Sequence, residues 1–277
     1  MKIIHKDKWG FWFFTRYTFI IEDEEALSDL IKTFLETFKG KSKKPGLILK
    51  TSSATYSIMD RDEMLDKIQK IRATVGKDNE LPNVYLLHGE LEDSEVNELY
   101  NHPKVKAHVS FTKGEGYGRP LLEASISQKP VIAPNYSGHL DFLDSEMSIL
   151  LPGEVKQIHP SAVIQNMLIP ESQWFTIDYK KAADVLEDVF KNHKKYTEGA
   201  KRQSYRSRTE FSLEKMSEKL LNILDKDIQI EYQERSGIVE KLLIDYYQDI
   251  QHNLEKELGL IKNNQNQNNQ HDQNYQF

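Results

Sequence analysis

Short apolar runs alternate along this chain with longer segments of helical periodicity. Six runs have the length of buried strands: Phe11–Thr15, Gly46–Lys50, Val84–His88, Val105–Phe111, Pro130–Ala133 and Ser148–Leu151. The segments with apolar residues three and four positions apart are Glu24–Phe38, Asp60–Val75, Ser94–Tyr100, Pro120–Ser127, Tyr179–Lys195 and Leu213–Leu224. Strands separated by helices form βαβ units around a parallel sheet. The sequence therefore predicts one doubly wound α/β domain over residues 10–224, without a second sheet.

The segments outside this domain differ from it in composition. Residues 1–9 are interpreted as a leader or as the remnant of an interdomain segment. Residues 225–262 are predicted to form a helical extension, whose apolar stripe consists of Ile238, Leu242, Leu243 and Tyr246. Residues 263–277 are rich in Asn and Gln and are predicted to be a disordered tail, because they offer almost nothing to bury.

Composition excludes several classes of protein. The chain has 277 residues, a net charge of −6 and a pI of about 5.9, whereas a broad nucleic-acid interface normally has a basic balance. It contains no cysteine, so disulfides and cysteine-based zinc sites are impossible. The first residues lack the small-residue cleavage site of a signal peptide, and no apolar run has the length of a membrane span. We therefore expect a cytoplasmic protein without nucleic-acid partners and without a transmembrane segment.

The segment Phe111–Ser125, FTKGEGYGRPLLEAS, has the composition of a nucleotide-binding loop. It does not match the dinucleotide fingerprint G-x-G-x-x-G, because Arg119 occupies the place of the third glycine, and the kinase glycine loop fails at the same position. The chain has no G-x-x-x-x-G-K-[ST] motif. The tripeptide Asp60-Arg61-Asp62 has the D-x-D form of some metal sites, but Asp60 is better explained as a helix N-cap that forms a capping box with Glu63.

The two glutamates of this segment offer a better explanation. Glu115 lies in the loop after a predicted strand, and Glu123 lies about one turn into the helix that Pro120 begins. Both can face the edge where open α/β sheets bind ligands, on either side of a helix N-terminus that favours a diphosphate. A carboxylate accepts hydrogen bonds from two adjacent sugar hydroxyls. The pattern favours a ligand with phosphate and sugar groups, although acidic residues near a helix start also occur as plain surface carboxylates.

The string GEGYGRPLLEA resembles the E-x7-E signature of retaining GT-B glycosyltransferases of the family-4 kind, the glycosyl transferases group 1 domain. The flanking strings resemble the same family: LLHGELEDSEVNELYNHPKVKAHVSF before it, KPVIAPNYSGHLDFL after it, and FSLEKMSEKLLNIL as the closing helix. The resemblance covers about residues 10 to 224. It implies the Rossmann-like C-terminal half of a GT-B fold, which binds a nucleotide sugar.

The resemblance assigns a role to each matching residue. It implies that Glu123 binds the ribose hydroxyls, that Glu115 contacts the donor sugar, and that Lys50 and Arg16 bind the phosphates. The positions implied to hold the sugar and the diphosphate are Gly116, Tyr117, Gly118, Pro120, Leu121, Leu122 and, after the fifth strand, Gly138. The sequence departs from the family pattern after Arg16, where the usual glycine is missing, and at His139 and Asp141. The alternative for Lys50 is a solvated residue at a strand end.

The implied reaction transfers a sugar from a nucleoside diphosphate sugar to an acceptor hydroxyl, with retention of configuration and without a metal or another cofactor. The acceptor can be a sugar, a lipid or a protein. A GT-B enzyme has two such halves, and only nine residues precede the predicted domain, which begins at residue 10. We therefore expect the N-terminal half on a separate chain or missing, and a membrane association through that half is compatible with the sequence. The alternative function is a non-catalytic nucleotide-sugar-binding or assembly module.

Overall fold

The computed structural model describes residues 10–14, 24–51, 56–158, 160–163, 168–224, 241, 244–254 and 256; for residues 10–14, 24, 25 and 161 it describes the backbone alone. The chain divides into two compact units, with the break between Ser212 and Leu213. Each unit is described by itself. The predicted site residue Arg16 and the side chains of the first strand lie outside the described residues.

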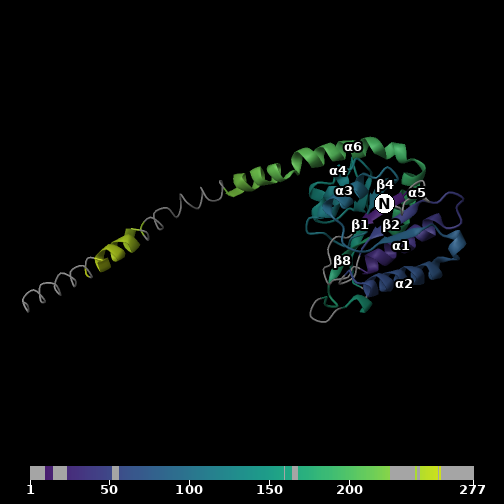
Figure 1. The fold of residues 1–277 in the computed structure, drawn as a ribbon, viewed down its shortest axis with the longest axis horizontal. Helices are drawn as coiled ribbons and strands as arrows, with labels where there is room; N and C mark the ends of the chain where they lie inside the picture. Colours follow the sequence, from purple (N-terminus) through teal and green to yellow (C-terminus); the bar gives the residue numbers. More distant parts are fainter. Residues whose placement is uncertain are drawn as a thin grey trace, which may run out of the picture. The chain divides into compact units, whose positions relative to one another are not determined.

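The first unit is built around a six-stranded parallel sheet (Figure 1). Its strands are β1 (Gly10–Phe14), β2 (Gly46–Lys50), β3 (Val84–Leu87), β4 (Val105–Val109), β5 (Val131–Pro134) and β6 (Ile149–Leu151). Their order in the sheet is β3-β2-β1-β4-β5-β6. Each strand begins and ends within two residues of its predicted bounds. The predicted doubly wound α/β fold is confirmed.

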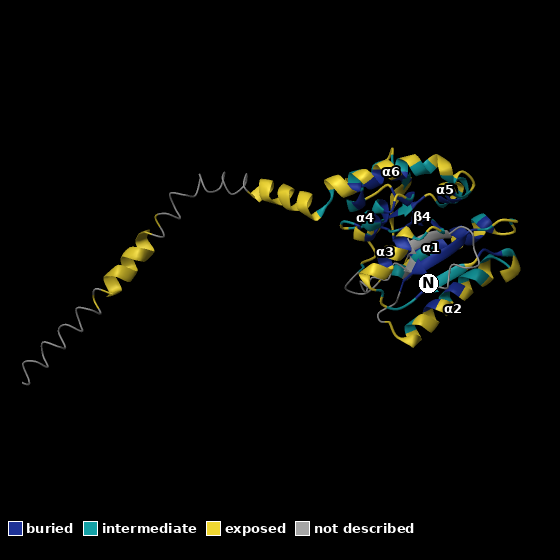
Figure 2. Cartoon of the chain, turned by 45° about the horizontal axis from the view of Figure 1, so that its top comes forward, coloured by how far each residue is buried: buried dark blue, intermediate teal, exposed yellow. Residues whose placement is uncertain are grey.

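Helices cover both faces of this sheet. The helices are α1 (Glu24–Phe38), α2 (Ile58–Val75), α3 (Asp93–Asn101), α4 (Arg119–Ile126), α5 (Tyr179–Lys191) and α6 (His193–Glu210), with short 3₁₀ turns at η2 (Asp78–Glu80), η3 (Gly138–Asp141) and η4 (Pro160–Ala162). Residues of α1, α2 and α5 share one apolar core with Leu47 and Leu49, whereas residues of α3 and α4 share the other with Ile48. This alternation along β2 is what a strand buried on both faces requires. Figure 2 shows the buried residues between the helices.

A second, two-stranded antiparallel sheet corrects the prediction of a single sheet. Strands β7 (Gly153–Gln157) and β8 (Gln173–Ile177) pair along their whole length. Every residue of β7 is exposed, so its sequence GEVKQ contains no buried apolar alternation that could have revealed a strand. Only Phe175 and Ile177 of β8 enter the core.

The predicted helix Tyr179–Lys195 is wrong in its extent, because the structure has two helices there. Helix α5 ends at Lys191, Asn192 leaves the helical conformation, and α6 continues for another 18 residues. The buried face of α6 is mostly small or polar, with Ala200, Gln203, Ser204 and Ser207. Hydrophobic periodicity could not detect this helix, since hydrogen bonds rather than apolar side chains attach it to the domain.

The start of α2 also differs from the prediction. The helix begins at Ile58, and Ser57 is its N-cap, because the Ser57 hydroxyl accepts a hydrogen bond of 3.1 Å from the backbone N–H of Asp60. Asp60 therefore lies in the first turn, where a carboxylate interacts favourably with the helix dipole.

The second unit is helical over its described residues. Residues 213–224 and 244–254 form helices whose apolar side chains are exposed within the part of the chain that is described, including Leu213, Leu220 and Tyr246. The predicted stripe residues Ile238, Leu242 and Leu243, and the Asn/Gln-rich segment 263–277, lie outside the described residues. No helix among the described residues is long and apolar enough to cross a membrane.

Candidate functional site

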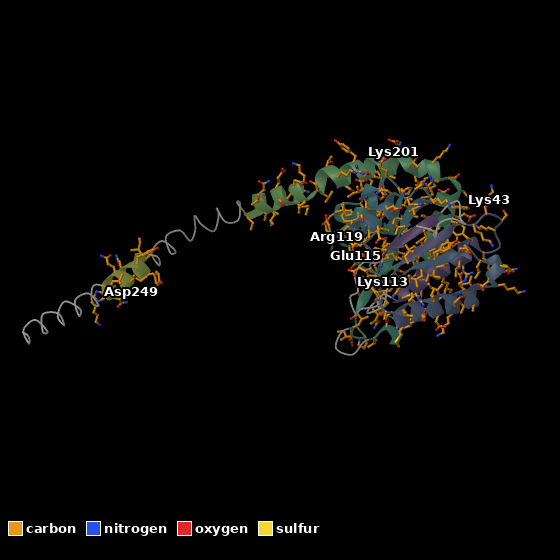
Figure 3. The ribbon with its side chains drawn as sticks, in the orientation of Figure 1. Lys43, Lys113, Glu115, Arg119, Lys201 and Asp249 are labelled. Carbon is orange, nitrogen blue, oxygen red and sulfur yellow. The ribbon has the colours of Figure 1, made fainter. Side chains whose placement is uncertain are left out.

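Those predicted site residues that the structure describes lie at the edge where the parallel strands end. In an open sheet with this strand order, ligands bind at the carboxyl edge near the point where the order reverses, between β1 and β4. The loop from Ser110 to Gly118 follows β4 at that point and leads into α4. Figure 3 shows Lys113, Glu115 and Arg119 on the same edge of the domain.

The backbone of Glu115 is fixed by two hydrogen bonds to the segment after β5. Its N–H donates a hydrogen bond of 2.8 Å to the hydroxyl of Ser137, and its carbonyl accepts one of 3.0 Å from the N–H of Gly138. The segment after β5 thus runs beside the loop after β4. The Glu115 side chain is half-buried and lies close to Gly118, where an added Cβ would be 3.5 Å from its Cβ and Cγ. The backbone of Glu115 and the first carbons of its side chain are therefore held in place by the loop.

Gly138 has no room for a side chain. A Cβ at this position would lie 2.1 Å from the carbonyl oxygen of Gly116 and 2.9 Å from that of Glu115. The neighbouring Ser137 has a φ of 74°, which is uncommon for a residue other than glycine. Strained backbone of this kind persists only where its surroundings hold it, and it is concentrated at functional sites. The two loops are therefore fitted to each other through backbone contacts.

The start of α4 presents backbone N–H groups at this edge. Gly118 is the N-cap in a left-handed conformation with a φ of 83°, and its carbonyl accepts the N–H groups of Leu121 and Leu122. Pro120 is buried near the start of the helix and has no N–H. Within the described part of the chain, the N–H groups of Gly116, Tyr117 and Gly118 donate no hydrogen bond. These three groups can bind an anion together with the helix dipole.

Glu123 lies one turn into α4, as predicted. Its Oε1 accepts a hydrogen bond of 2.8 Å from Nε of Arg119, and the side chains of the two residues are 23% and 56% exposed respectively. Glu115 and Glu123 therefore flank the first turn of the helix. Arg119, for which the sequence pattern predicts no role, forms an ion pair with one of the two predicted carboxylates.

Lys50 ends β2 on the same edge and is only 7% exposed. Its ammonium donates a hydrogen bond to the carbonyl of Gly89 and lies 5.3 Å from the centre of the Tyr56 ring. Burial lowers the pKa of Lys50, and the nearby Glu90 partly opposes this effect. No carboxylate of the described residues lies within 4.0 Å of this ammonium. The cation is thus available to an anionic ligand.

Lys113, in the loop after β4, is a buried residue outside the predicted site. Its Nζ donates a hydrogen bond of 3.1 Å to the hydroxyl of Tyr179 and lies 3.5 Å from Oδ2 of Asp29. The ring of Trp174 is 5.4 Å away, and the carbonyl of Lys113 accepts the N–H of Phe175 at 3.3 Å. The loop after β4 is therefore attached to α1, α5 and β8. No sequence signal marks this lysine, because its partners come from three distant segments.

Two other polar side chains complete the surroundings of the loop. His139 is fully buried and contacts the carbonyl of Pro134 at 2.7 Å, and burial lowers its pKa. A neutral imidazole in this position supports the loop rather than binding an anion. Burial and the nearby Asp141 raise the pKa of Tyr117, whose ring packs on Phe142.

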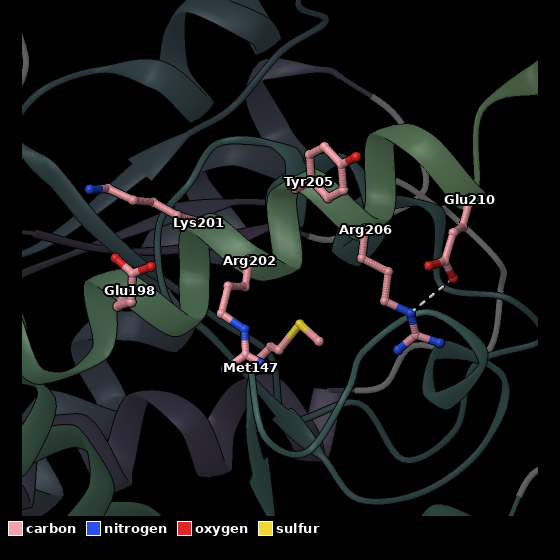
Figure 4. A pocket seen from close by; sticks show the side chains of 7 residues that line it. All are labelled: Met147, Glu198, Lys201, Arg202, Tyr205, Arg206 and Glu210. Carbon is pink, nitrogen blue, oxygen red and sulfur yellow. Dashed lines mark hydrogen bonds and ion pairs between the residues drawn. The ribbon is translucent and has the colours of Figure 1, made fainter.

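A separate hollow of about 430 Å³ lies along α6 (Figure 4). It is lined by Met147, Glu198, Lys201, Arg202, Tyr205, Arg206 and Glu210. None of the predicted site residues borders it. Over the described residues, no group of three His, Cys, Asp or Glu side chains has the arrangement of a metal site.

Sequence comparisons found no matching family model and no matching curated protein. Solved structures do match. HepE from Anabaena in complex with UDP and glucose has 13% identity and a TM-score of 0.53, and the match covers 79% of this chain and 49% of that chain. Sucrose-phosphate synthase from Thermosynechococcus elongatus has 14% identity and a TM-score of 0.55, with 81% and 46% covered.

The chain thus spans about half the length of these two proteins. A third match is the isolated C-terminal domain of a glycosyl transferase group 1 family protein from Francisella tularensis, with 18% identity and a TM-score of 0.50. In this case the match covers 75% of this chain and 88% of that domain. This chain therefore has the fold of the C-terminal, Rossmann-like half of a GT-B glycosyltransferase.

Proposed function

We propose that this chain is the donor-binding half of a retaining glycosyltransferase that transfers a sugar from a nucleoside diphosphate sugar to an acceptor hydroxyl. One observation carries the proposal: Glu115 and Glu123 flank the first turn of α4, beside three backbone N–H groups that donate no hydrogen bond within the described residues. Carboxylates suit sugar hydroxyls, and N–H groups at a helix start suit a diphosphate. The UDP and glucose named with the Anabaena structure support this type of ligand.

Each carboxylate has its own part in the proposal. Glu123 accepts hydrogen bonds from the ribose hydroxyls, and Glu115 accepts them from the donor sugar. Arg119 already donates to one oxygen of Glu123, so the ribose shares this carboxylate with the guanidinium. A carboxylate has lone pairs enough for both partners.

The diphosphate is bound by N–H groups and cations. We restrict the proposed backbone contacts to Gly116, Tyr117 and Gly118, because the N–H groups of Leu121 and Leu122 bond within the first turn of the helix. Lys50 supplies a cation from the end of β2. Arg16, which lies outside the described residues, is proposed as the second cation.

The reaction needs no protein nucleophile in this proposal. The bond between the anomeric carbon and the phosphate oxygen breaks, and the acceptor oxygen forms its bond on the same face of the sugar. The acceptor proton passes to an oxygen of the departing diphosphate. Lys50 and the N–H groups at the start of α4 stabilise the negative charge that develops there, so this half of the site requires no metal.

Calorimetric titration tests the proposal. The purified chain is titrated in the presence of EDTA with UDP, GDP and ADP and with their glucose, N-acetylglucosamine and mannose conjugates. We expect one donor to bind, and Glu123→Gln and Glu115→Gln to lose about 1–3 kcal/mol of binding free energy each, which is typical of a hydrogen bond to a charged group. Glu36→Gln, on the exposed face of α1, is the matched control.

Two results would contradict the proposal. The first is a folded chain that binds none of these nucleotides and nucleotide sugars. The second is donor binding that the Glu36→Gln control and the two site variants share equally.

A further inference from the structure

Helix α6 is a basic element in an acidic protein. Its 18 residues include six Lys and Arg and two Glu, whereas the whole chain has a net charge of −6. The buried face of the helix is small or polar, so the basic side chains lie on its outer faces. Three of them, Lys201, Arg202 and Arg206, line the hollow beside Met147 (Figure 4). This hollow therefore has a local excess of basic residues on a protein whose overall charge is negative.

Hydrogen bonds fix the two walls of the hollow relative to each other. Gln203, on the buried face of α6, accepts the N–H of Asp144 at 3.0 Å and donates to the carbonyl of Phe142 at 2.7 Å. A Cβ added to Gly199 would lie 3.0 Å from the carbonyl oxygen of Met147, so the helix approaches that turn closely. The hollow is thus formed before a ligand binds.

The charged side chains of the hollow are of two kinds. Arg206 is compensated by Glu210, whose Oε2 lies 3.2 Å from its Nε. Lys201 and Arg202 form no ion pair within 4.0 Å over the described residues, and neither does Glu198. The hollow therefore offers two cations and one carboxylate to a ligand, with an excess of one positive charge.

We propose that this hollow binds a small phosphate ester that carries hydroxyl groups. Lys201 and Arg202 donate hydrogen bonds to the phosphate, and the flat guanidinium matches two phosphate oxygens at once. Glu198 accepts a hydrogen bond from a hydroxyl group on the carbon chain of the same ligand. The volume of about 430 Å³ is typical of small-molecule sites, which measure roughly 300–1,000 Å³.

The charge pattern favours a small ligand over a nucleic acid. A nucleic-acid interface neutralises many phosphates along a basic surface, whereas only two cations of this hollow are uncompensated and Glu198 lies with them. The ring of Tyr205 borders the hollow and is 73% exposed, so it offers an apolar face to the carbon atoms of a ligand. The inference is independent of the proposed function, because no proposed donor-binding residue lines the hollow.

The same chemistry occurs in free glycerol and sugar phosphates and in the headgroup of phosphatidylglycerol. Calorimetric titration of the full chain with glycerol 3-phosphate, glucose 6-phosphate and inorganic phosphate tests the free ligands. Co-sedimentation with vesicles of phosphatidylcholine alone, or mixed with phosphatidylglycerol, tests the lipid. We expect binding of at least one ester or of the mixed vesicles, and weaker binding of inorganic phosphate.

The combined substitutions Lys201→Gln and Arg202→Gln should weaken this binding about tenfold, as expected for the loss of a hydrogen bond to a charged group. Lys194→Gln with Arg208→Gln is the matched control, because it removes one Lys and one Arg from α6 outside the hollow. Lys50→Met, in the proposed donor site, should leave the affinity for the ester unchanged. Thermal unfolding checks that all variants fold.

Four results would overturn the inference. The first is a folded wild type that binds neither ester and sediments equally with both kinds of vesicle. The second is an equal loss of binding in the two double variants. The third is inorganic phosphate that binds as tightly as the esters, which would exclude a contact with their hydroxyl groups. The fourth is a loss in Lys50→Met, which would assign the phosphate ester to the donor site.

Discussion

Two strand ends of the same sheet each carry a buried lysine, and the two lysines differ in their partners. Lys113, after β4, contacts the carboxylate of Asp29 and the hydroxyl of Tyr179. Lys50, at the end of β2, contacts the carbonyl of Gly89 and the face of the Tyr56 ring. Both side chains are less than a tenth exposed. The ammonium of Lys113 lies 3.5 Å from a carboxylate oxygen of Asp29, whereas the direct contacts of Lys50 are neutral and the nearby Glu90 acts on it only through a longer-range electrostatic interaction.

The two lysines therefore have different roles: Lys113 stabilises the loop after β4, and Lys50 is proposed to bind the ligand. A buried charge without a carboxylate in direct contact is costly, and such a charge is a candidate for binding a ligand of opposite charge. The loop after β4 is supported by Lys113 and by the close fit of Gly138, so that Glu115 and the start of α4 are fixed before a ligand binds. Lys50 then supplies charge at a neighbouring strand end. Changes in the first region should affect stability, and changes in the second should affect affinity.

The largest effect is expected from Gly138→Ala. The new methyl group would overlap with the carbonyl oxygen of Gly116, only 2.1 Å away, so that one of the two loops must move. We expect a loss of roughly 3 kcal/mol in the free energy of unfolding, at the upper end for overpacking, together with loss of donor binding. Urea denaturation and calorimetry measure the two effects.

Gly116→Ala is the control for this prediction. A Cβ at Gly116 would meet no atom within 4 Å, and the residue has no positive φ. Alanine at such a position changes stability by less than about 1 kcal/mol, usually in the stabilising direction. Equal destabilisation by both substitutions would show that the fit between the loops does not support the site.

The Lys113→Met substitution tests the internal charge pair. It removes the hydrogen bond to Tyr179 and leaves Asp29, which is 27% exposed, without its cation. We expect the free energy of unfolding to fall by about 1–3 kcal/mol. In a double-mutant cycle with Asp29→Asn, the two losses should not add. Additive losses would mean that the two residues act independently.

The secondary structure was predicted correctly where the hydrophobic pattern alone identifies an element. Apolar runs such as Gly46–Lys50 revealed the six strands, because strands buried on both faces need apolar residues at every position. Helix α6 was missed because Gln203 and Ser207 attach it through hydrogen bonds. Strand β7 was missed because its exposed residues carry no pattern.

In the candidate site, too, the residues that form a local sequence pattern were predicted and those that depend on distant segments were not. Glu115 and Glu123 could be found because seven residues separate them across a loop and a helix start, which is a local pattern. Arg119 and Glu123 are only four residues apart, but this spacing does not determine that their side chains form a hydrogen bond. Lys113 could not be found, since its contact with Asp29 joins segments far apart in the chain.

The Lys50→Met substitution tests the other lysine. Removing this buried charge should change the free energy of unfolding by less than about 1 kcal/mol, because the lost desolvation cost offsets the lost hydrogen bond and the lost attraction to Glu90. We expect affinity for the nucleoside diphosphate to fall by about 1–3 kcal/mol and affinity for the nucleoside to stay the same. Lys50→Arg, which keeps the charge, is the control. An equal loss for nucleoside and diphosphate would place the ligand's phosphates elsewhere.

The smallest effect is a pH dependence of donor binding. Burial lowers the pKa of Lys50 in the free protein, and a bound diphosphate beside the ammonium would raise it again. The complex then binds more protons than the free protein in the interval between the two pKa values. Affinity is therefore at its full value below the lowered pKa of the free protein and falls as the pH rises through it.

As the pH rises through the lowered pKa of Lys50 in the free protein, wild-type affinity for the nucleoside diphosphate should decline and proton uptake on binding should appear. Lys50→Met should lack this part of the decline, since methionine does not titrate. Calorimetry in two buffers of different ionisation enthalpy measures the proton uptake directly. An equal decline in both proteins would mean that a titratable group other than Lys50 causes it. The ammonium of Lys50 would then have no part in binding the diphosphate.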